Sequence, residues 1–155
     1  MTMFVTATMG DVTEIAAPNG WSALGVDPAR PVAHLSVGNP HTVVGVDDLH
    51  AVELETLGGA VPDVNLEIIA AGPDANSIAM RVHERGVGIT EACGSGACAS
   101  AVAATRWGLA APRDGKLVVH MDGGRASVGL KDHGAGVTSV TLSGPTTYLA
   151  TIELP

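Results

Sequence analysis

The sequence predicts an α+β fold in which a curled, mixed or antiparallel β-sheet wraps around a central helix. Most of the chain divides into short runs rich in Val, Ile, Leu and Thr, separated by turns that contain Gly, Pro, Asn or Asp. Residues 96–107 form the best helix candidate and consist mainly of Ala, Ser, Gly and Val. Such small side chains allow strands to approach the helix closely on every side, so we expect the helix to be central.

The composition supports one domain with an aliphatic core. The chain has 155 residues, which suits a single domain over 1–155 that buries its own core. Hydrophobic residues make up 46% of the chain and aromatic residues only 3%, so the core must consist of Val, Leu, Ile, Ala and Met. Twenty glycines and nine prolines predict many turns.

Charge and cysteine content exclude several classes of partner. The formal net charge of −8 argues against a nucleic-acid partner and against an anionic membrane surface. No apolar run approaches the roughly 18–20 residues of a membrane span, and the N-terminus lacks the basic and apolar regions of a signal peptide. Two cysteines five positions apart do not form a disulfide framework. We therefore expect a cytoplasmic protein.

The first half of the chain reads as strands joined by loops and one short helix. Turn formers are dense over 16–31, which predicts a loop, and Asn39-Pro40 interrupts two strand-like runs. Asp47 and Asp48 are typical of a helix start, and Gly58 of a helix end. Strands are expected at 3–9, 32–38, 41–46, 64–70 and 77–84.

The second half contains the principal helix and the closing strands. Gly108 is expected to end the helix over 96–107. Strands are expected at 116–121, 125–130, 137–142 and 146–154, with hairpin turns at 122–124 and 132–134 between the first three.

Cys93 stands directly before the turn Gly94-Ser95-Gly96, at the expected start of the helix. The first N–H groups of a helix have no internal partner and favour an anion. Those of Gly94, Ser95 and Gly96 could hold a carboxylate, and the pKa of a cysteine there can be lowered. The sulfur would lie beside the adjacent carbon, which suits proton transfer at the α-carbon of an amino acid. The alternative is a buried structural cysteine.

Other polar residues are candidates with equally ordinary alternatives. Asn39 and His41 could present an amide and an imidazole to a ligand, or belong to a simple turn. Glu84 and Arg85 could bind the ammonium and carboxylate of a zwitterion, or be solvated loop charges. Asn65 is a substrate amide or a strand-end cap. No role is expected for the histidines on surface-like segments: His34, His50, His83, His120 and His133.

The second cysteine does not extend the candidate site. Cys98 falls inside the helix between alanines and is expected to pack. The spacing CGSGAC is not that of a zinc site, so no metal is expected.

Four motifs together resemble the diaminopimelate epimerase family, in order and at suitable separations. They are GNPH (38–41), VN (64–65), ERGVGIT (84–90) and ACGSGACA (92–99). The resemblance extends over essentially the whole chain, and GPTTYLATIEL is similar to the family's last strand. Proline racemases and phenazine-biosynthesis isomerases have a similar turn but lack the ERG combination.

The resemblance implies an enzyme that interconverts LL- and meso-diaminopimelate without pyridoxal phosphate, metal or other cofactor. Two cysteines then act on opposite faces of the α-carbon, and Cys93 matches one of them. It places the reaction in bacterial lysine and cell-wall precursor synthesis in the cytoplasm. The matching substrate-binding positions are Asn39, Asn65, Glu84, Arg85, Gly94 and Ser95, and His41 matches a histidine near the catalytic centre.

The chain also departs from the family pattern, because a first half with a motif like MCGNG is absent. It resembles the C-terminal domain alone, so we expect it to need the missing N-terminal half-domain and to be inactive or nearly so by itself. A homodimer with two Cys93 thiols across one cleft is an alternative. A non-catalytic binding module that keeps the fold, and a racemase of another amino acid, are further alternatives. Thr42 and Ser95 stand where Cys and Thr are common in the family.

Overall fold

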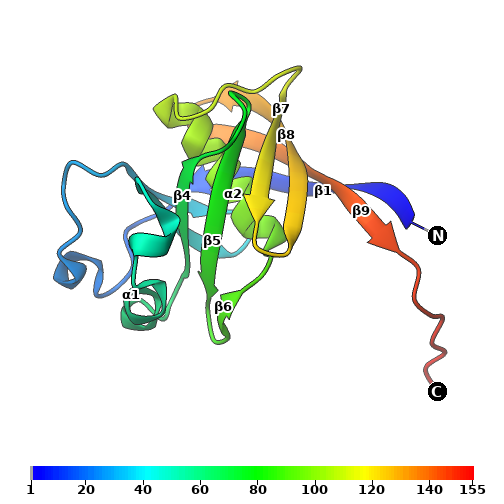
Figure 1. The fold of residues 1–155 in the computed structure, drawn as a ribbon, viewed down its shortest axis with the longest axis horizontal. Helices are drawn as coiled ribbons and strands as arrows, with labels where there is room; N and C mark the ends of the chain where they lie inside the picture. Colours follow the sequence, from blue (N-terminus) through cyan, green and yellow to red (C-terminus); the bar gives the residue numbers. More distant parts are fainter. Residues whose placement is uncertain (1) are drawn as a thin grey trace.

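The structure is a computed structural model that describes residues 2–155. One sheet, with the strand order β4-β3-β2-β1-β9-β8-β7-β5-β6, contains the nine strands of this region, and two α-helices accompany it (Figure 1). The strands are β1 (Thr2–Glu14), β2 (Val32–Ser36), β3 (Pro40–Gly45), β4 (Asn65–Ala71), β5 (Ser77–Glu84), β6 (Gly88–Thr90), β7 (Lys116–Met121), β8 (Gly124–Gly134) and β9 (Val137–Thr147). The helices are α1 (Leu54–Ala60) and α2 (Gly94–Trp107), with short 3-10 turns η1 (Trp21–Leu24) and η2 (Leu49–Ala51).

The sheet closes on itself because β4 pairs with β5 as well as with β3. The pairs β3–β4 and β5–β7 are parallel, and the other neighbours are antiparallel. The short strand β6 lies outside this ring and pairs with the end of β5. This architecture confirms the predicted α+β fold.

Helix α2 fills the interior of the closed sheet and contacts each of its eight strands. Residues 96–104 are all buried, so the helix has no solvent-facing side along this stretch. Small side chains make this possible, because each strand can lie close to the helix backbone. Gly108, in the left-handed conformation at φ 68°, ends the helix as predicted. No helix among residues 2–155 is long and apolar enough to cross a membrane.

The core is aliphatic, as the composition predicted. Its main cluster surrounds α2 and includes Leu35, Ile69, Met80 and Leu117, each at most 2% exposed. Burying one such side chain stabilises a fold by about 1.5–3 kcal/mol. A second, smaller cluster packs α1 and η1 against the outer face of β3 and β4.

The helix expected between Asp47 and Gly58 is two separate elements. Asp48 caps η2, where its Oδ1 accepts the N–H of His50 at 2.8 Å. Val52 then takes an extended conformation (φ −100°, ψ 127°), which ends that turn before α1 begins. The expected start at Asp48 was therefore correct, but one continuous helix was wrong. The expected end at Gly58 was also wrong, because α1 continues to Ala60.

Two further sequence predictions were wrong. The turn expected at 132–134 lies within β8, and the chain reverses at Ala135 and Gly136, which have φ values of 52° and 75°. Asp132 Oδ1 accepts the N–H of Gly134 at 2.8 Å beside a register shift, so the Asp-His-Gly sequence forms an irregularity of the strand instead of its turn.

His83, expected on the surface, is only 8% exposed, because Gly58 of α1 leaves room for its ring.

The strand predicted over 146–154 is present only at its start. Strand β9 ends at Thr147, and no other strand pairs with the residues after it. Tyr148, Leu149, Ile152 and Leu154 are 63–89% exposed. The pattern of the segment favours a strand, but a strand needs a neighbour for its hydrogen bonds.

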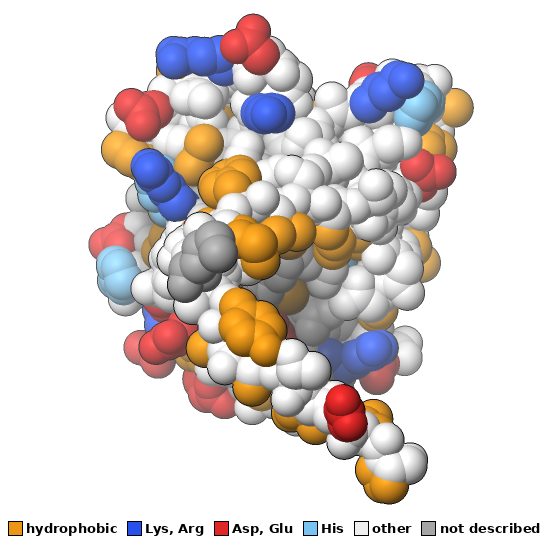
Figure 2. All heavy atoms as spheres, turned by 90° about the vertical axis from the view of Figure 1, so that its right-hand side faces the viewer, with side chains coloured by type: hydrophobic (Ala, Val, Ile, Leu, Met, Phe, Trp, Pro, Cys, Tyr) orange, Lys and Arg blue, Asp and Glu red, His pale blue; other side chains and the backbone are white. Residues whose placement is uncertain are grey.

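A two-stranded arm leaves the closed sheet next to this tail. It pairs residues 2–6 of β1 with residues 143–147 of β9, and we refer to it as the β1–β9 arm (Figure 1). Ser143, at the base of the arm, also pairs with Ser127 of β8. Met3, Phe4 and Val5 on the arm are 45–71% exposed. Figure 2 faces the arm and shows hydrophobic side chains gathered across this side of the molecule and along the tail.

Candidate active site

Cys93 is the N-cap of α2, where its extended backbone (φ −143°, ψ 113°) leads into the helix. Its Sγ accepts the backbone N–H of Gly96 at 3.3 Å. A Cβ at position 96 would lie 3.1 Å from this sulfur and 2.6 Å from Glu67 Oε1. Glycine at 96 therefore allows the sulfur, a buried carboxyl group and the first turn of α2 to lie together.

The start of α2 offers two free amides beside the sulfur. Among the hydrogen bonds of residues 2–155, none uses the N–H groups of Gly94 or Ser95. The expected third donor, Gly96, already serves Cys93. The helix dipole favours an anion at this end, so the arrangement suits one carboxylate held by two amides.

Burial raises the pKa of the Cys93 thiol from its ordinary value of 9.0 to about 11. The hydrogen bonds from Gly96 and Ser95 act in the opposite direction, while the charges of Glu67 and Glu84 raise the pKa further. The cost of removing a thiolate from water therefore exceeds the stabilisation that the first turn of α2 gives it. The expected lowering of this pKa was wrong for the chain alone. Cys93 is a protonated thiol at neutral pH.

Asn39 and Ser95 bring the Asn-Pro-His corner to the cysteine turn. Asn39 Nδ2 donates to Ser95 Oγ at 3.2 Å, and Ser95 Oγ lies 3.7 Å from Cys93 Sγ. His41 Nε2 is 3.0 Å from Asn39 Oδ1. The His41 ring is fully buried, so it meets the site through Asn39 and not directly.

Glu67 is a site residue that the sequence analysis missed. Its Oε1 is 2.6 Å from His41 Nδ1, and both side chains are completely buried. Burial raises the pKa of Glu67 from 4.5 to about 7, although the contact with His41 lowers it. A carboxyl group inside the apolar strand VNLEIIA was the available signal, because such a group is almost never buried without a partner.

Asn65 connects two segments that border the site. Its Nδ2 donates to Pro40 O at 3.1 Å, and its Oδ1 accepts the backbone N–H of Arg85 at 2.8 Å. Both ends of the amide are therefore engaged within the protein. Of the two predicted roles, these contacts fit the strand-end cap.

Glu84 and Arg85 lie where β5 ends. Glu84 is half-buried and Arg85 exposed, and within residues 2–155 neither side chain forms an ion pair or a side-chain hydrogen bond. Glu84 is close enough to Cys93 to raise its pKa. Both charges are therefore available to a ligand.

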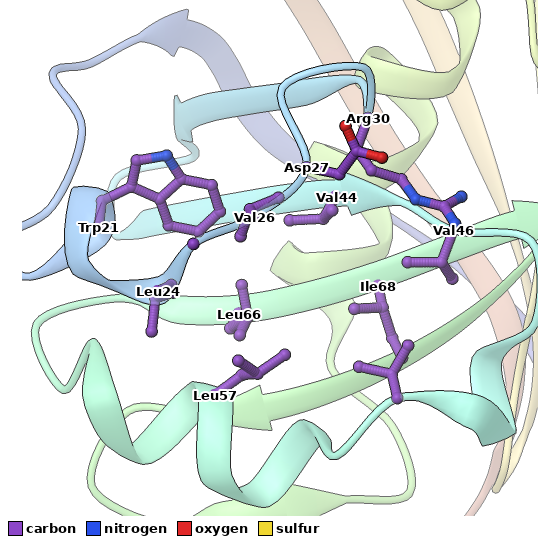
Figure 3. Close-up of a pocket in the computed structure, with 12 residues that line it drawn as sticks. Trp21, Leu24, Val26, Asp27, Arg30, Val44, Val46, Leu57, Leu66 and Ile68 are labelled. Atoms are coloured by element: carbon purple, nitrogen blue, oxygen red, sulfur yellow. The ribbon is translucent and has the colours of Figure 1, made fainter.

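Cys98 is fully buried in the main core cluster, which confirms its predicted packing role. Among residues 2–155, no three His, Cys, Asp or Glu side chains come together to hold a metal ion. A cavity of about 290 Å³ lies elsewhere, between η1, α1, β3 and β4 (Figure 3). Its walls are mainly apolar, with Trp21, Leu57 and Leu66 among them. Asp27 and Arg30 also line it, and no predicted site residue does.

The comparisons with known sequences agree with the motifs. A family model described as diaminopimelate epimerase matches residues 34–148. A protein named diaminopimelate epimerase from Rhodospirillum centenum is 41% identical over 139 residues, which cover 84% of this chain and 44% of that protein. One of the same name from Rhizorhabdus wittichii is 37% identical over 145 residues, covering 89% and 48%. The chain therefore spans just under half the length of these relatives.

Solved structures share the fold at low sequence identity. The crystal structure of a hydroxyproline epimerase from Agrobacterium vitis matches with a TM-score of 0.62 and 16% identity, over 94% of this chain and 50% of that one. A PhzF-family phenazine biosynthesis protein from Bacillus anthracis matches with a TM-score of 0.63 and 14% identity, over 95% and 61%. Both are similar in fold over about half of their length.

Proposed function

This chain belongs to the diaminopimelate epimerase family, and we propose that it supplies one half of an enzyme that epimerises LL-diaminopimelate to meso-diaminopimelate. One observation carries the proposal: the Cys93 sulfur lies at the start of α2 beside the two free amides of Gly94 and Ser95. A carboxylate on those amides brings the neighbouring α-carbon to the sulfur.

We assign Cys93 as an acid and base at that α-carbon. Its thiolate removes the α-proton, so the C–H bond breaks, an S–H bond forms and the electron pair remains on the substrate. A second thiol on the opposite face then gives its proton to the carbanion, and the configuration is inverted. In the reverse direction Cys93 is the donor, which matches the protonated thiol that its raised pKa implies. No electrons are exchanged, so the step requires no redox cofactor.

Free amides and charged side chains are available for each group of the substrate. We propose that the amides of Gly94 and Ser95 bind the α-carboxylate and that Glu84 and Arg85 bind the ammonium and carboxylate groups of this doubly zwitterionic amino acid. Asn39 and Asn65 border the same site. A simple apolar amino acid would leave the charged pair without a use, which argues against a racemase for such a substrate.

The second cysteine is proposed to come from an N-terminal half-domain. The chain spans under half the length of its relatives, and the β1–β9 arm and tail expose large hydrophobic side chains that a partner would cover. Leu142, the residue before the arm, lies against Gly94. A domain covering the arm would therefore also border Cys93. This enzyme would act in lysine and cell-wall precursor synthesis in a bacterial cytoplasm.

The test is α-proton exchange of diaminopimelate in deuterated water, followed by NMR, with the chain alone and with a separately produced N-terminal half of a relative. We expect exchange and stereoinversion only in the mixture. Inversion by the chain alone, together with a dimeric mass, would favour the homodimer with two Cys93 thiols. No exchange with any added half would favour a binding module that has kept the fold.

A further inference from the structure

A continuous series of contacts connects the buried Glu67 with Cys93. It starts on β4, passes through the β3 corner and ends at the first turn of α2. The contacts are Glu67 Oε1 to His41 Nδ1 at 2.6 Å, His41 Nε2 to Asn39 Oδ1 at 3.0 Å, Asn39 Nδ2 to Ser95 Oγ at 3.2 Å, and Ser95 Oγ to Cys93 Sγ at 3.7 Å.

The donors and acceptors in this series have one consistent direction. Asn39 Oδ1 can only accept a hydrogen bond, so His41 Nε2 must carry a proton and donate it. The other end of the amide, Nδ2, then donates to Ser95 Oγ. Because the Ser95 oxygen accepts this bond, its hydroxyl hydrogen is free to form a hydrogen bond to the sulfur of Cys93.

Glu67 determines the state of the imidazole at the far end. The 2.6 Å contact between Glu67 Oε1 and His41 Nδ1 requires one proton between them, on either atom. In both cases His41 Nε2 keeps its own proton and the pair has no net charge. This matters at the site, because negative charge on Glu67 opposes a thiolate at Cys93 and the imidazole beside it limits that charge.

We infer that Glu67 is a positioning residue for Cys93, because through His41 and Asn39 it turns the hydroxyl of Ser95 toward the sulfur as a hydrogen-bond donor. The inference deepens the proposed function and rests on it for its catalytic meaning. The donor stabilises the thiolate whenever Cys93 holds no proton, which the epimerisation requires once in every turnover. A buried carboxyl group and a buried imidazole thus support a cysteine through the half-buried amide of Asn39.

The first test measures how fast iodoacetamide alkylates Cys93 at pH 8 in the full chain, with Cys98→Ala present so that one thiol reacts. Ser95→Ala removes the donor and should raise the pKa of Cys93 by about one unit. The thiolate fraction then falls about tenfold, but the remaining thiolate is more nucleophilic, so alkylation should slow roughly threefold. Thermal unfolding of each variant checks that the fold is kept.

Asn39→Asp tests the direction of the series, because a carboxylate can only accept hydrogen bonds. The Ser95 hydroxyl would then donate to this carboxylate and no longer to the sulfur of Cys93. Alkylation should slow at least as much as in Ser95→Ala. Most of this effect should disappear when Asn39→Asp is made on top of Ser95→Ala, since no hydroxyl remains to be turned. Equal slowing in both backgrounds would mean that the new charge acts alone, and the inference would be wrong.

The second test reads the ring nitrogens of His41 by ¹H–¹⁵N NMR, with His41→Gln used to assign the signals. In the unsubstituted chain, Nε2 should carry a proton, because it donates to Asn39 Oδ1. The amide of Glu67→Gln can donate or accept, so it can pair with either neutral tautomer of His41. The Nε2 signal should then move toward the value for a mixture of the two tautomers. An Nε2 without a proton, or one unaffected by Glu67→Gln, would overturn the role of Glu67. Neither test involves turnover, so its failure would leave the proposed activity standing.

Discussion

The sulfur of Cys93 lies 3.3 Å from the backbone nitrogen of Gly96 and accepts its N–H, so the cysteine caps the helix that would carry its chemistry. This bond fixes the sulfur beside the free amides of Gly94 and Ser95. It also holds the thiol in a partly buried position, where its pKa is raised to about 11.

The raised pKa predicts a thiol that reacts slowly at neutral pH. Alkylation of Cys93 by iodoacetamide should accelerate steadily as the pH rises from 7 to 10, with no plateau near 9. A plateau near pH 9, the ordinary value for a thiol, would show that burial does not control this group.

The same pKa shift predicts a dependence of stability on pH. A thiol with a higher pKa in the folded than in the unfolded chain contributes full stability below about pH 9 and loses it as the pH rises toward 11. The free energy of unfolding, measured with urea, should fall across this range. The fall should be smaller in Cys93→Ala than in the unsubstituted chain.

Gly96→Ala should damage the site locally. The added Cβ would lie 2.6 Å from Glu67 Oε1, which is buried and held by His41 and cannot move away easily. Overpacking of this kind costs about 1–3 kcal/mol of stability, and the alkylation rate of Cys93 should change with it.

Gly59→Ala is the matched control, because nothing lies within 4 Å of a Cβ at this exposed position of α1. It should stabilise the chain by about 0.5–1 kcal/mol, since alanine favours a helix. Equal losses of stability in the two variants would contradict the packing described around Gly96.

Cys98→Ala should separate packing from chemistry. Cys98 is fully buried in the core, so losing its sulfur should cost about 1 kcal/mol of stability, as for other single-atom deletions. Proton exchange in the reconstituted enzyme should be unchanged. A loss of stereoinversion comparable to that of Cys93→Ala would contradict the assignment of the reactive cysteine.

Removing residues 148–155 should separate folding from association. Tyr148 Oη contacts Thr151 Oγ1, within the tail itself, and the large side chains of the tail are exposed. The melting temperature of the shortened chain should therefore be unchanged. Its affinity for the added N-terminal half, measured by calorimetry, should fall at least tenfold. Undiminished affinity would show that the tail is not part of the contact.

Local sequence patterns predicted most of the fold. The small-residue helix, its end at Gly108 and the strands 77–84 and 116–121 follow from composition and turn residues, and the structure has them. The split between η2 and α1 could not be predicted, because it depends on the extended backbone of Val52. The tail reads as a strand, but whether a strand forms depends on a neighbour that a local pattern does not contain.

The candidate site was also predicted only in part from the sequence. The motifs identified Cys93, Ser95 and Asn39, which the structure brings together. They did not identify Glu67, because its importance comes from pairing across β3 and β4 with His41. The pKa of Cys93 was also misjudged, since burial by surrounding strands is a property of the folded chain and not of the turn.

The most direct measurement is stereoinversion of LL-diaminopimelate in deuterated water by Cys93→Ala mixed with the N-terminal half. We predict no inversion, and α-deuterium incorporation into only one of the two configurations, because a single thiol serves a single face of the α-carbon. The unsubstituted chain in the same mixture should invert the substrate and label both configurations. Inversion by Cys93→Ala at the rate of the unsubstituted chain would contradict the account.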